Sequence, residues 1–214
     1  MSYTAKDIRN VCLLGHSGTG KTSLVESMLY LTGSIDRLGK VTDGNTVCDN
    51  DPEEIKRQIS ISLAVAPVYF KGCKINVLDT PGYFDFSGEV MEGLRVADAG
   101  IIVGSAKGGL SVGTEKAWKY LQERNMPRAI YISKTDEENG DFNGAWQTLR
   151  EKFGRSVCPV MMPLWDEEKH IETLLDIVYR RAYQLEGKRR KEVPIPEDKK
   201  DVVEELYEQL CESV

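Results

Sequence analysis

A glycine-rich motif constrains the fold of this chain more than any other feature of its sequence. The motif runs from Gly15 to Thr22, reads Gly-His-Ser-Gly-Thr-Gly-Lys-Thr and matches G-x-x-x-x-G-K-[ST] without a mismatch. The apolar run at 8–14 predicts a buried strand before the motif, and apolar residues at helical spacing predict a helix after it, ending near Gly33. The chain therefore begins with a strand, a glycine loop and a helix.

Apolar runs and helical stripes alternate as far as Gly154, whereas residues 34–59 show no period and read as a long loop. Expected strands cover 61–70, 74–79, 99–106 and 128–133, and expected helices cover 86–97, 114–124 and 142–153. The first two strands read as a hairpin that turns at Lys71-Gly72. This alternation predicts an α/β fold with a mostly parallel sheet and helices on both faces.

The sequence pattern changes after Gly154. We expect a strand at 157–164, a helix over 171–185, a solvated basic turn at 188–191 and an amphipathic helix through Val203, Leu206 and Leu210. The chain thus divides into a main domain, residues 1–155, and a smaller α/β segment, residues 156–214.

Composition excludes several classes of protein. The 214 residues carry 28 Lys and Arg against 34 Asp and Glu, a net charge of −6, and 41% are hydrophobic, which excludes a disordered chain. No apolar run is long enough to cross a membrane, and charged residues occupy the place of a signal-peptide core. The five scattered cysteines read as reduced thiols without a zinc site. We expect a cytoplasmic protein that binds neither membrane nor DNA.

The glycine motif carries a definite chemistry. Its backbone N–H groups can surround phosphate oxygens at the positive end of the following helix, Lys21 can span the outer phosphates, and the Thr22 hydroxyl can bind Mg²⁺. The other residues expected to touch the nucleotide here are Gly15, His16, Ser17, Gly18, Thr19, Gly20 and Ser23. The competing interpretation is a glycine turn that binds nothing.

Two further motifs follow at the ends of expected strands. Asp79-Thr-Pro-Gly82 offers a carboxylate that can hold Mg²⁺ through water and an N–H, on Gly82, that can bond a terminal phosphate. Ser133-Lys134-Thr135-Asp136 offers a carboxylate that can accept two hydrogen bonds from guanine. Adenine lacks that donor pair, so Asp136 would select GTP over ATP.

With these motifs in this order, the chain resembles the G domain of translational GTPases, most closely that of elongation factor G and its paralogues. Other matching segments are Arg9-Asn-Val, Leu29-Tyr-Leu-Thr-Gly33, Tyr83-Phe-Asp-Phe86, Leu94-Arg-Val-Ala-Asp98 and Val193-Pro-Ile-Pro196. The resemblance implies a P-loop GTPase fold, GTP and GDP with Mg²⁺ as ligands, the ribosome as partner and ribosome-stimulated hydrolysis in protein synthesis. It also implies that residues 156–214 belong to the insertion subdomain of that G domain.

Departures from the family pattern concern the reaction. Ser60 stands where the family has the Thr that binds Mg²⁺, and the resemblance makes it a metal ligand. Gln58 replaces a glycine, which puts the ordered geometry of this switch in doubt. Tyr83 occupies the position of the histidine that orients the attacking water, and a phenol cannot simply replace an imidazole. With Lys21 and Tyr83 as the residues nearest the chemistry, we expect slow or absent hydrolysis.

Ser133 replaces the Asn of the family's N-K-x-D motif. Its shorter side chain is expected to lose one or two hydrogen bonds to the base and the P-loop backbone, at a cost of about 1–3 kcal/mol. By contrast, Ser105-Ala-Lys107 imitates a guanine-contact loop but precedes Asp136, so it reads as the end of a strand.

Three alternatives stay open: a GTP-binding module without hydrolysis, a ribosomal protection protein of the tetracycline-resistance type, and, less favoured, a P-loop kinase or ATPase. The missing guanine-contact loop and the helical pattern at the C-terminus further predict an N-terminal fragment of a larger factor.

Overall fold

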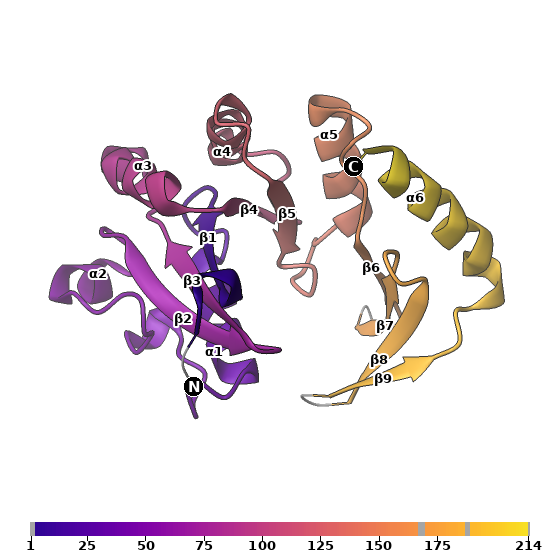
Figure 1. Cartoon of the computed structure of the whole chain (residues 1–214), viewed down its shortest axis with the longest axis horizontal. Helices are drawn as coiled ribbons and strands as arrows, with labels where there is room; N and C mark the ends of the chain where they lie inside the picture. Colours follow the sequence, from indigo (N-terminus) through magenta and orange to yellow (C-terminus); the bar gives the residue numbers. More distant parts are fainter. Residues whose placement is uncertain (1–2, 167–169, 187–188, 214) are drawn as a thin grey trace. The chain divides into compact units, whose positions relative to one another are not determined.

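The computed structural model describes residues 3–166, 170–186 and 189–213, which belong to two compact units that divide between Lys134 and Thr135 (Figure 1). No helix in these described ranges is long and apolar enough to span a bilayer.

The first unit is built on a five-stranded sheet in the order β2-β3-β1-β4-β5 (Figure 1). Its strands are β1 (Ile8–Leu14), β2 (Ala64–Phe70), β3 (Cys73–Asp79), β4 (Ala99–Ser105) and β5 (Arg128–Ser133). Its helices are α1 (Lys21–Leu31), α2 (Pro52–Arg57), α3 (Ser87–Val96) and α4 (Val112–Glu123), with 3-10 turns η1 (Ala5–Asp7), η2 (Val41–Asp43) and η3 (Phe84–Phe86). Strands β3, β1, β4 and β5 run parallel and only β2 is antiparallel, so the predicted mostly parallel sheet is confirmed.

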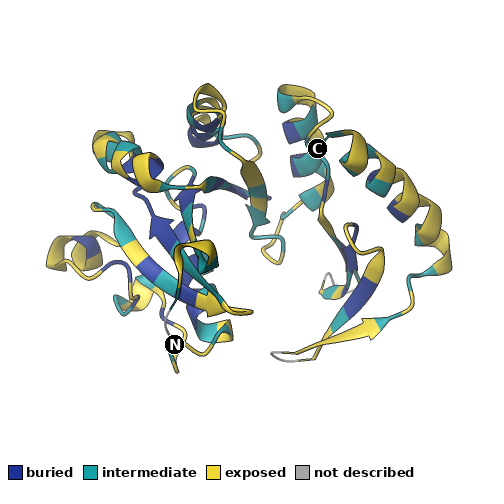
Figure 2. Ribbon diagram, in the orientation of Figure 1, coloured by how far each residue is buried: buried dark blue, intermediate teal, exposed yellow. Residues whose placement is uncertain are grey.

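Alternating side chains of β1 divide the core between the two faces of the sheet. Leu13 packs with Val25 and Leu29 of α1 on one face. Cys12 and Leu14 point to the other face, where they pack against apolar residues of α3 and α4. Successive strand residues point to opposite faces, so one short strand serves both layers. Figure 2 shows buried residues on the central strands β1, β3 and β4.

The segment predicted as an unbroken loop, residues 34–59, contains a short helix, α2. Asp51 accepts a hydrogen bond from the N–H of Glu53 at 2.7 Å, and Glu54 accepts one from the N–H of Asp51 at 3.1 Å. Asp51-Pro52-Glu53-Glu54 is a capping box with proline in the first turn. The prediction was wrong because it relied on periodicity, which six residues are too few to display.

The second unit packs helices α5 (Phe142–Phe153) and α6 (Lys200–Ser213) with an antiparallel sheet and a turn, η4 (Glu197–Lys199). The sheet order is β6 (Met161–Trp165), β7 (Ile171–Asp176), β8 (Arg181–Glu186) and β9 (Arg189–Val193). Trp146 of α5 packs against the buried cluster that contains Leu175 and Leu206, and Arg150 donates a hydrogen bond to Gln209 at 2.9 Å. The units divide earlier than the change of sequence pattern at Gly154 because α5 shares this second core.

The helix predicted over 171–185 is wrong, since this stretch forms β7, a turn and β8. The N–H of Tyr179 donates to Asp176 Oδ1 at 3.1 Å, and Arg180 adopts a left-handed φ of 52°. Asp side chains favour such turns, and a left-handed residue ends a right-handed helix. The apolar residues that suggested a helix lie instead on two paired strands, where Leu175 of β7 is opposite Ala182 of β8.

The prediction of a basic turn is also wrong for residues 189–191, because they are exposed residues of strand β9. Lys188, the first residue of the predicted turn, lies outside the described residues. The last predicted helix, through Val203 and Leu206, is confirmed as α6.

Candidate functional site

The glycine loop joins the buried end of β1 to the start of α1, as its sequence predicts. Gly20, the residue before α1, has a φ of +91°, a conformation that side chains other than glycine rarely adopt. Gly15 lies so close to the carbonyl oxygen of Val103 that a Cβ there would clash. The Thr19 hydroxyl donates to the carbonyl of His16 at 2.9 Å and closes the loop on itself.

Lys21 is almost fully buried within this loop. Its Nζ donates to the carbonyls of Gly15 and His16 at 3.1 and 3.0 Å. Burial lowers the pKa of Lys21, and the nearby carboxylates of Asp79 and Asp49 oppose that shift. The result is a cation held in place next to the loop's backbone, as binding of phosphate requires.

Three predicted metal ligands lie together beside Lys21. The Thr22 hydroxyl donates to Asp79 Oδ2 at 2.7 Å, and Ser60 Oγ lies 3.3 Å from Thr22 Oγ1. Residues from α1, the segment after α2 and the end of β3 therefore meet at one point. Asp49 joins them through a hydrogen bond with Ser60, and sequence reasoning missed it. The sequence feature that could have identified Asp49 is an acidic residue shortly before Ser60, in a stretch without a hydrophobic period.

These residues fit a hard divalent cation. Asp79 is buried, and its Oδ1 has no hydrogen-bond partner among the described residues. A buried carboxylate oxygen without a partner is costly unless a cation or water satisfies it. Mg²⁺ prefers carboxylate, hydroxyl and water oxygens, which is the donor set offered by Thr22, Ser60 and Asp79.

Two other buried carboxylates fasten the segment that leads to Ser60. Glu26 of α1 accepts hydrogen bonds from the N–H groups of Gly39 and Val47, at 3.0 and 2.5 Å. Glu54 of α2 accepts from the N–H groups of Ile61 and Ser62, at 2.9 and 3.0 Å. We call Glu26 and Glu54 the carboxylate anchors. Together they place Ser60 beside Thr22.

Gln58 does not prevent this arrangement, contrary to the doubt raised from sequence. It ends α2 in the left-handed conformation, at φ 55° and ψ 39°, and Ile59 donates to the carbonyl of Glu54 at 3.2 Å. The backbone adopts this conformation with Gln58 in place, but a left-handed conformation costs a residue other than glycine about 1–2 kcal/mol.

Replacing Gln58 with glycine is therefore expected to stabilise the chain by about 1 kcal/mol. Glycine removes the conformational cost, while the loss of the long hydrogen bond from Gln58 to the Thr42 carbonyl, 3.3 Å, is minor. Urea unfolding of Gln58→Gly and Gln58→Ala measures the effect. Equal stability of the two variants would contradict the argument, because alanine keeps the cost.

Ser133 corrects another expectation, because its shorter side chain does reach the P-loop. Ser133 Oγ lies 2.7 Å from the carbonyl oxygen of Thr19 and 2.9 Å from that of Gly104. Strand β5 carries the hydroxyl to the loop, so the contact with the P-loop backbone is kept. The hydroxyl has a single proton to share between the two carbonyls.

Ser133→Ala is expected to lower the free energy of unfolding by about 1 kcal/mol, because it leaves these carbonyls without their donor. Ser105→Ala is the matched control, since Ser105 Oγ only accepts a bond from the exposed N–H of Lys107 at 3.2 Å. Urea unfolding of both variants provides the measurement. A larger loss in the control would show that the Ser133 contact does not support the loop.

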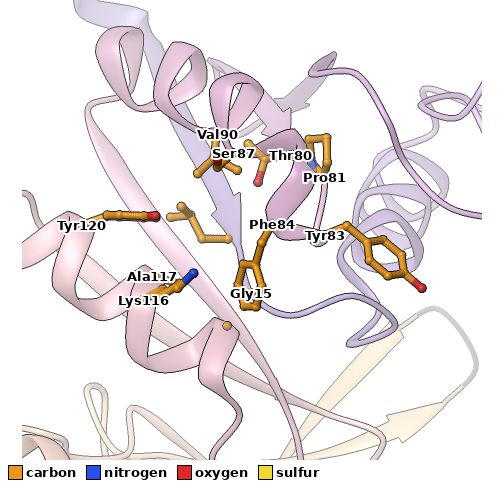
Figure 3. Close-up of a pocket in the computed structure, with 13 residues that line it drawn as sticks. Gly15, Thr80, Pro81, Tyr83, Phe84, Ser87, Val90, Lys116, Ala117 and Tyr120 are labelled. Carbon is orange, nitrogen blue, oxygen red and sulfur yellow. The ribbon is translucent and has the colours of Figure 1, made fainter.

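The D-T-P-G segment continues from β3 across the P-loop. The Thr80 hydroxyl donates to the carbonyl of Leu13 at 2.6 Å, and Gly82 lies against Ser17. Tyr83 is 44% exposed, and its ring points away from Phe84 and Lys116 (Figure 3). Lys134 ends the first unit with a φ of 59°, and Asp136 belongs to the second unit. Guanine recognition by Asp136 stays a prediction.

A glycine loop between β1 and α1, a carboxylate at the end of the neighbouring parallel strand and a mostly parallel sheet define a P-loop GTPase fold. Residues 6–212 match the family model described as "Elongation factor Tu GTP binding domain", and the chain belongs to this family of translational GTPases.

Similarity to individual proteins supports this family assignment. The chain is 38% identical over 208 residues to an "Elongation factor G-like protein" of Mycobacterium tuberculosis, covering 97% of this chain and 28% of the relative. It is 34% identical over 212 residues to "Elongation factor G" of Mycoplasma genitalium, covering 98% and 31%. A crystal structure of a Thermus thermophilus protein superposes with a TM-score of 0.88 at 35% identity, covering 96% and 31%. The chain thus spans about 30% of the length of these relatives.

Proposed function

We propose that this chain is the GTP- and GDP-binding switch of an elongation factor G-like translation factor that acts on the ribosome in the cytoplasm. The observation that carries the proposal is the unpartnered Oδ1 of Asp79 beside the hydroxyls of Thr22 and Ser60, at the mouth of a complete P-loop. A glycine turn without a ligand has no need of such an arrangement.

In this proposal, the backbone of residues 15–23 and the Lys21 ammonium hold the phosphates, and Gly82 reads the terminal one. Ser133, Lys134 and Asp136 form the guanine side of the site. Residues 1–155 form the GTP-binding domain, and residues 156–214 belong to an insertion subdomain.

Mg²⁺ would be held by Thr22 and Ser60 directly and by Asp79 through water. When bound, the ion neutralises charge on the outer phosphates. In support of this arrangement, the Thr22 hydroxyl donates a hydrogen bond to the buried carboxylate of Asp79 at 2.7 Å.

Calorimetric titration of the chain with GTP, GDP and ATP, with and without Mg²⁺, tests the binding. We expect GTP and GDP to bind more tightly than ATP and Mg²⁺ to strengthen the binding. Equal affinity for ATP and GTP would contradict the role of Asp136. Turnover of GTP by the full-length factor, with and without ribosomes, tests the partner and the activity.

Binding of Mg²⁺ is expected to depend on pH through Asp79. Burial raises the pKa of Asp79 to about 6, and this outweighs the opposing hydrogen bond from Thr22 and the charge of Lys21. A proton competes with the cation below that pKa, so the Mg²⁺ affinity should fall about tenfold between pH 7 and pH 5.

The stability of the metal-free chain should change in the opposite direction. The pKa of Asp79 is raised from its ordinary value of 3.8 to about 6 in the folded chain, so the charged carboxylate destabilises the fold fully above about pH 6, and this cost disappears as the pH falls from about 6 to about 4. Urea unfolding and Mg²⁺ titrations across this range measure both effects. Asp79→Asn is the control that removes both, and pH profiles that are the same in this variant would contradict the assignment.

A further inference from the structure

Side chains from three elements of the first unit meet around the ring of Phe84 in η3. Lys116 Nζ of α4 lies 3.7 Å from the centre of the Phe84 ring (Figure 3). The His16 ring, from the P-loop, lies 5.9 Å from it at a tilt of 55°. A cation over an aromatic face at this distance is attractive. We call Lys116 and Phe84 the latch.

The backbone beside the latch rests directly on the P-loop. A Cβ built on Gly82 would lie 2.6 Å from Ser17 N and 2.7 Å from Lys21 Nζ. A Cβ on Gly113, at the start of α4, would lie 2.6 Å from His16 Cα. The D-T-P-G segment and α4 are therefore both in close contact with the glycine loop.

This contact matters for the terminal phosphate of GTP. In the proposed site, that phosphate accepts hydrogen bonds from Gly82 N–H and from Lys21 Nζ, each needing about 2.7–3.2 Å between heavy atoms. Gly82 is in close contact with the backbone of Ser17 and with Lys21 Nζ, which leaves little room for a phosphate between Gly82 and the P-loop. Binding of GTP thus requires Gly82 to move away from the P-loop, whereas GDP has no phosphate at that point.

Movement of Gly82 carries Phe84 with it and weakens the latch. Phe84 lines a pocket together with Leu14, Val90, Ala117 and Tyr120 (Figure 3). Phe84 is two residues from Gly82, so a displacement of Gly82 shifts the ring relative to Lys116 and weakens the cation–π contact.

We propose that Lys116 is a specificity-determining residue that shifts the nucleotide preference of this site from GTP toward GDP, by holding Phe84 and thereby Gly82 in place. The inference rests on the proposed GTP and GDP site and deepens it. Lys116 acts through Phe84 and Gly82 and does not touch the nucleotide.

The test measures the affinity of the 214-residue chain for fluorescent GDP and for a fluorescent, non-hydrolysable GTP analogue in Mg²⁺. Lys116→Met keeps the aliphatic stem and removes the cation, and Phe84→Leu keeps the apolar bulk and removes the aromatic face. Lys119→Met is the matched control, because Lys119 lies on the same helix and forms an exposed pair with Glu123 at 3.7 Å. Circular dichroism melts verify that each variant folds.

We expect each latch variant to lower the ratio of the GTP-analogue Kd to the GDP Kd about two- to fivefold, the effect of one solvent-accessible cation–π contact. The double variant should show no larger shift than either single variant, because both remove the same contact. The control should leave the ratio unchanged.

An unchanged ratio in both latch variants, or additive shifts in the double variant, would overturn the inference while leaving the nucleotide site intact. Failure of the unmodified chain to bind either nucleotide would instead overturn the proposed function, and the inference with it.

Discussion

Replacing Tyr83 with histidine is expected to raise the rate constant of GTP hydrolysis about 10- to 100-fold. An imidazole at this position can orient and deprotonate the attacking water, a contribution typically of about 10²–10⁴ in rate. The phenol of Tyr83 points away from the latch and is 44% exposed (Figure 3). If hydrolysis is slow, as the sequence predicts, this single side chain is the expected reason.

The measurement is a single-turnover assay of the full-length factor on ribosomes, with the Tyr83→Phe variant as control. We expect Tyr83→Phe to hydrolyse GTP as slowly as the unmodified factor, because the hydroxyl takes no part. A large loss of rate in Tyr83→Phe would mean that the phenol contributes. Turnover as fast as that of an ordinary elongation factor before any substitution would refute the prediction of slow hydrolysis.

Replacing Asp136 with asparagine is expected to change the base that the site prefers. The carboxylate would accept two hydrogen bonds from guanine, each worth about 1.5–3 kcal/mol because the acceptor is charged. An amide offers one acceptor and one donor, which faces the amino group of guanine unfavourably but suits the carbonyl oxygen of xanthine. We expect the GTP affinity to fall at least about 100-fold and the affinity for xanthosine triphosphate to rise.

The Asp136→Ala variant distinguishes a change of base preference from a general loss of nucleotide binding. It should lose GTP binding without gaining xanthosine triphosphate, because alanine offers neither donor nor acceptor. Competition binding with both nucleotides gives the answer. If Asp136→Asn kept its preference for GTP, guanine recognition would have to lie elsewhere in the chain.

The first unit could be predicted well from sequence, whereas in the second the helices could be predicted and most of the sheet could not. Strands β1, β4 and β5 are continuous apolar runs that end at glycine or polar motifs, so their type and order follow from pattern alone. Residues 171–185 have apolar positions compatible with either a helix or two strand faces. A turn centred on Asp176 and Arg180 decides between them, and periodicity does not detect it.

The candidate site, too, could be predicted from sequence only in part. Motif spacing is sufficient to bring Thr22 and Asp79 together, because both follow neighbouring parallel strands. Asp49 and the reach of Ser133 depend on how a loop folds back and how far β5 extends, and no local pattern encodes either. Sequence therefore predicted that Thr22 and Asp79 lie together, but not all of the side chains around them.

The carboxylate anchors have a consequence for how the segment before Ser60 comes loose. Glu26 fixes residues 39 and 47, whereas Glu54 fixes residues 61 and 62, and the long hydrogen bond from Gln58 to the Thr42 carbonyl, 3.3 Å, joins the two stretches. The segment is thus held at two separate places, and we expect the loss of one anchor to leave the other in place. We expect that opening at Glu54 would free the stretch around Ser60, while Glu26 would keep residues 39 and 47 on α1.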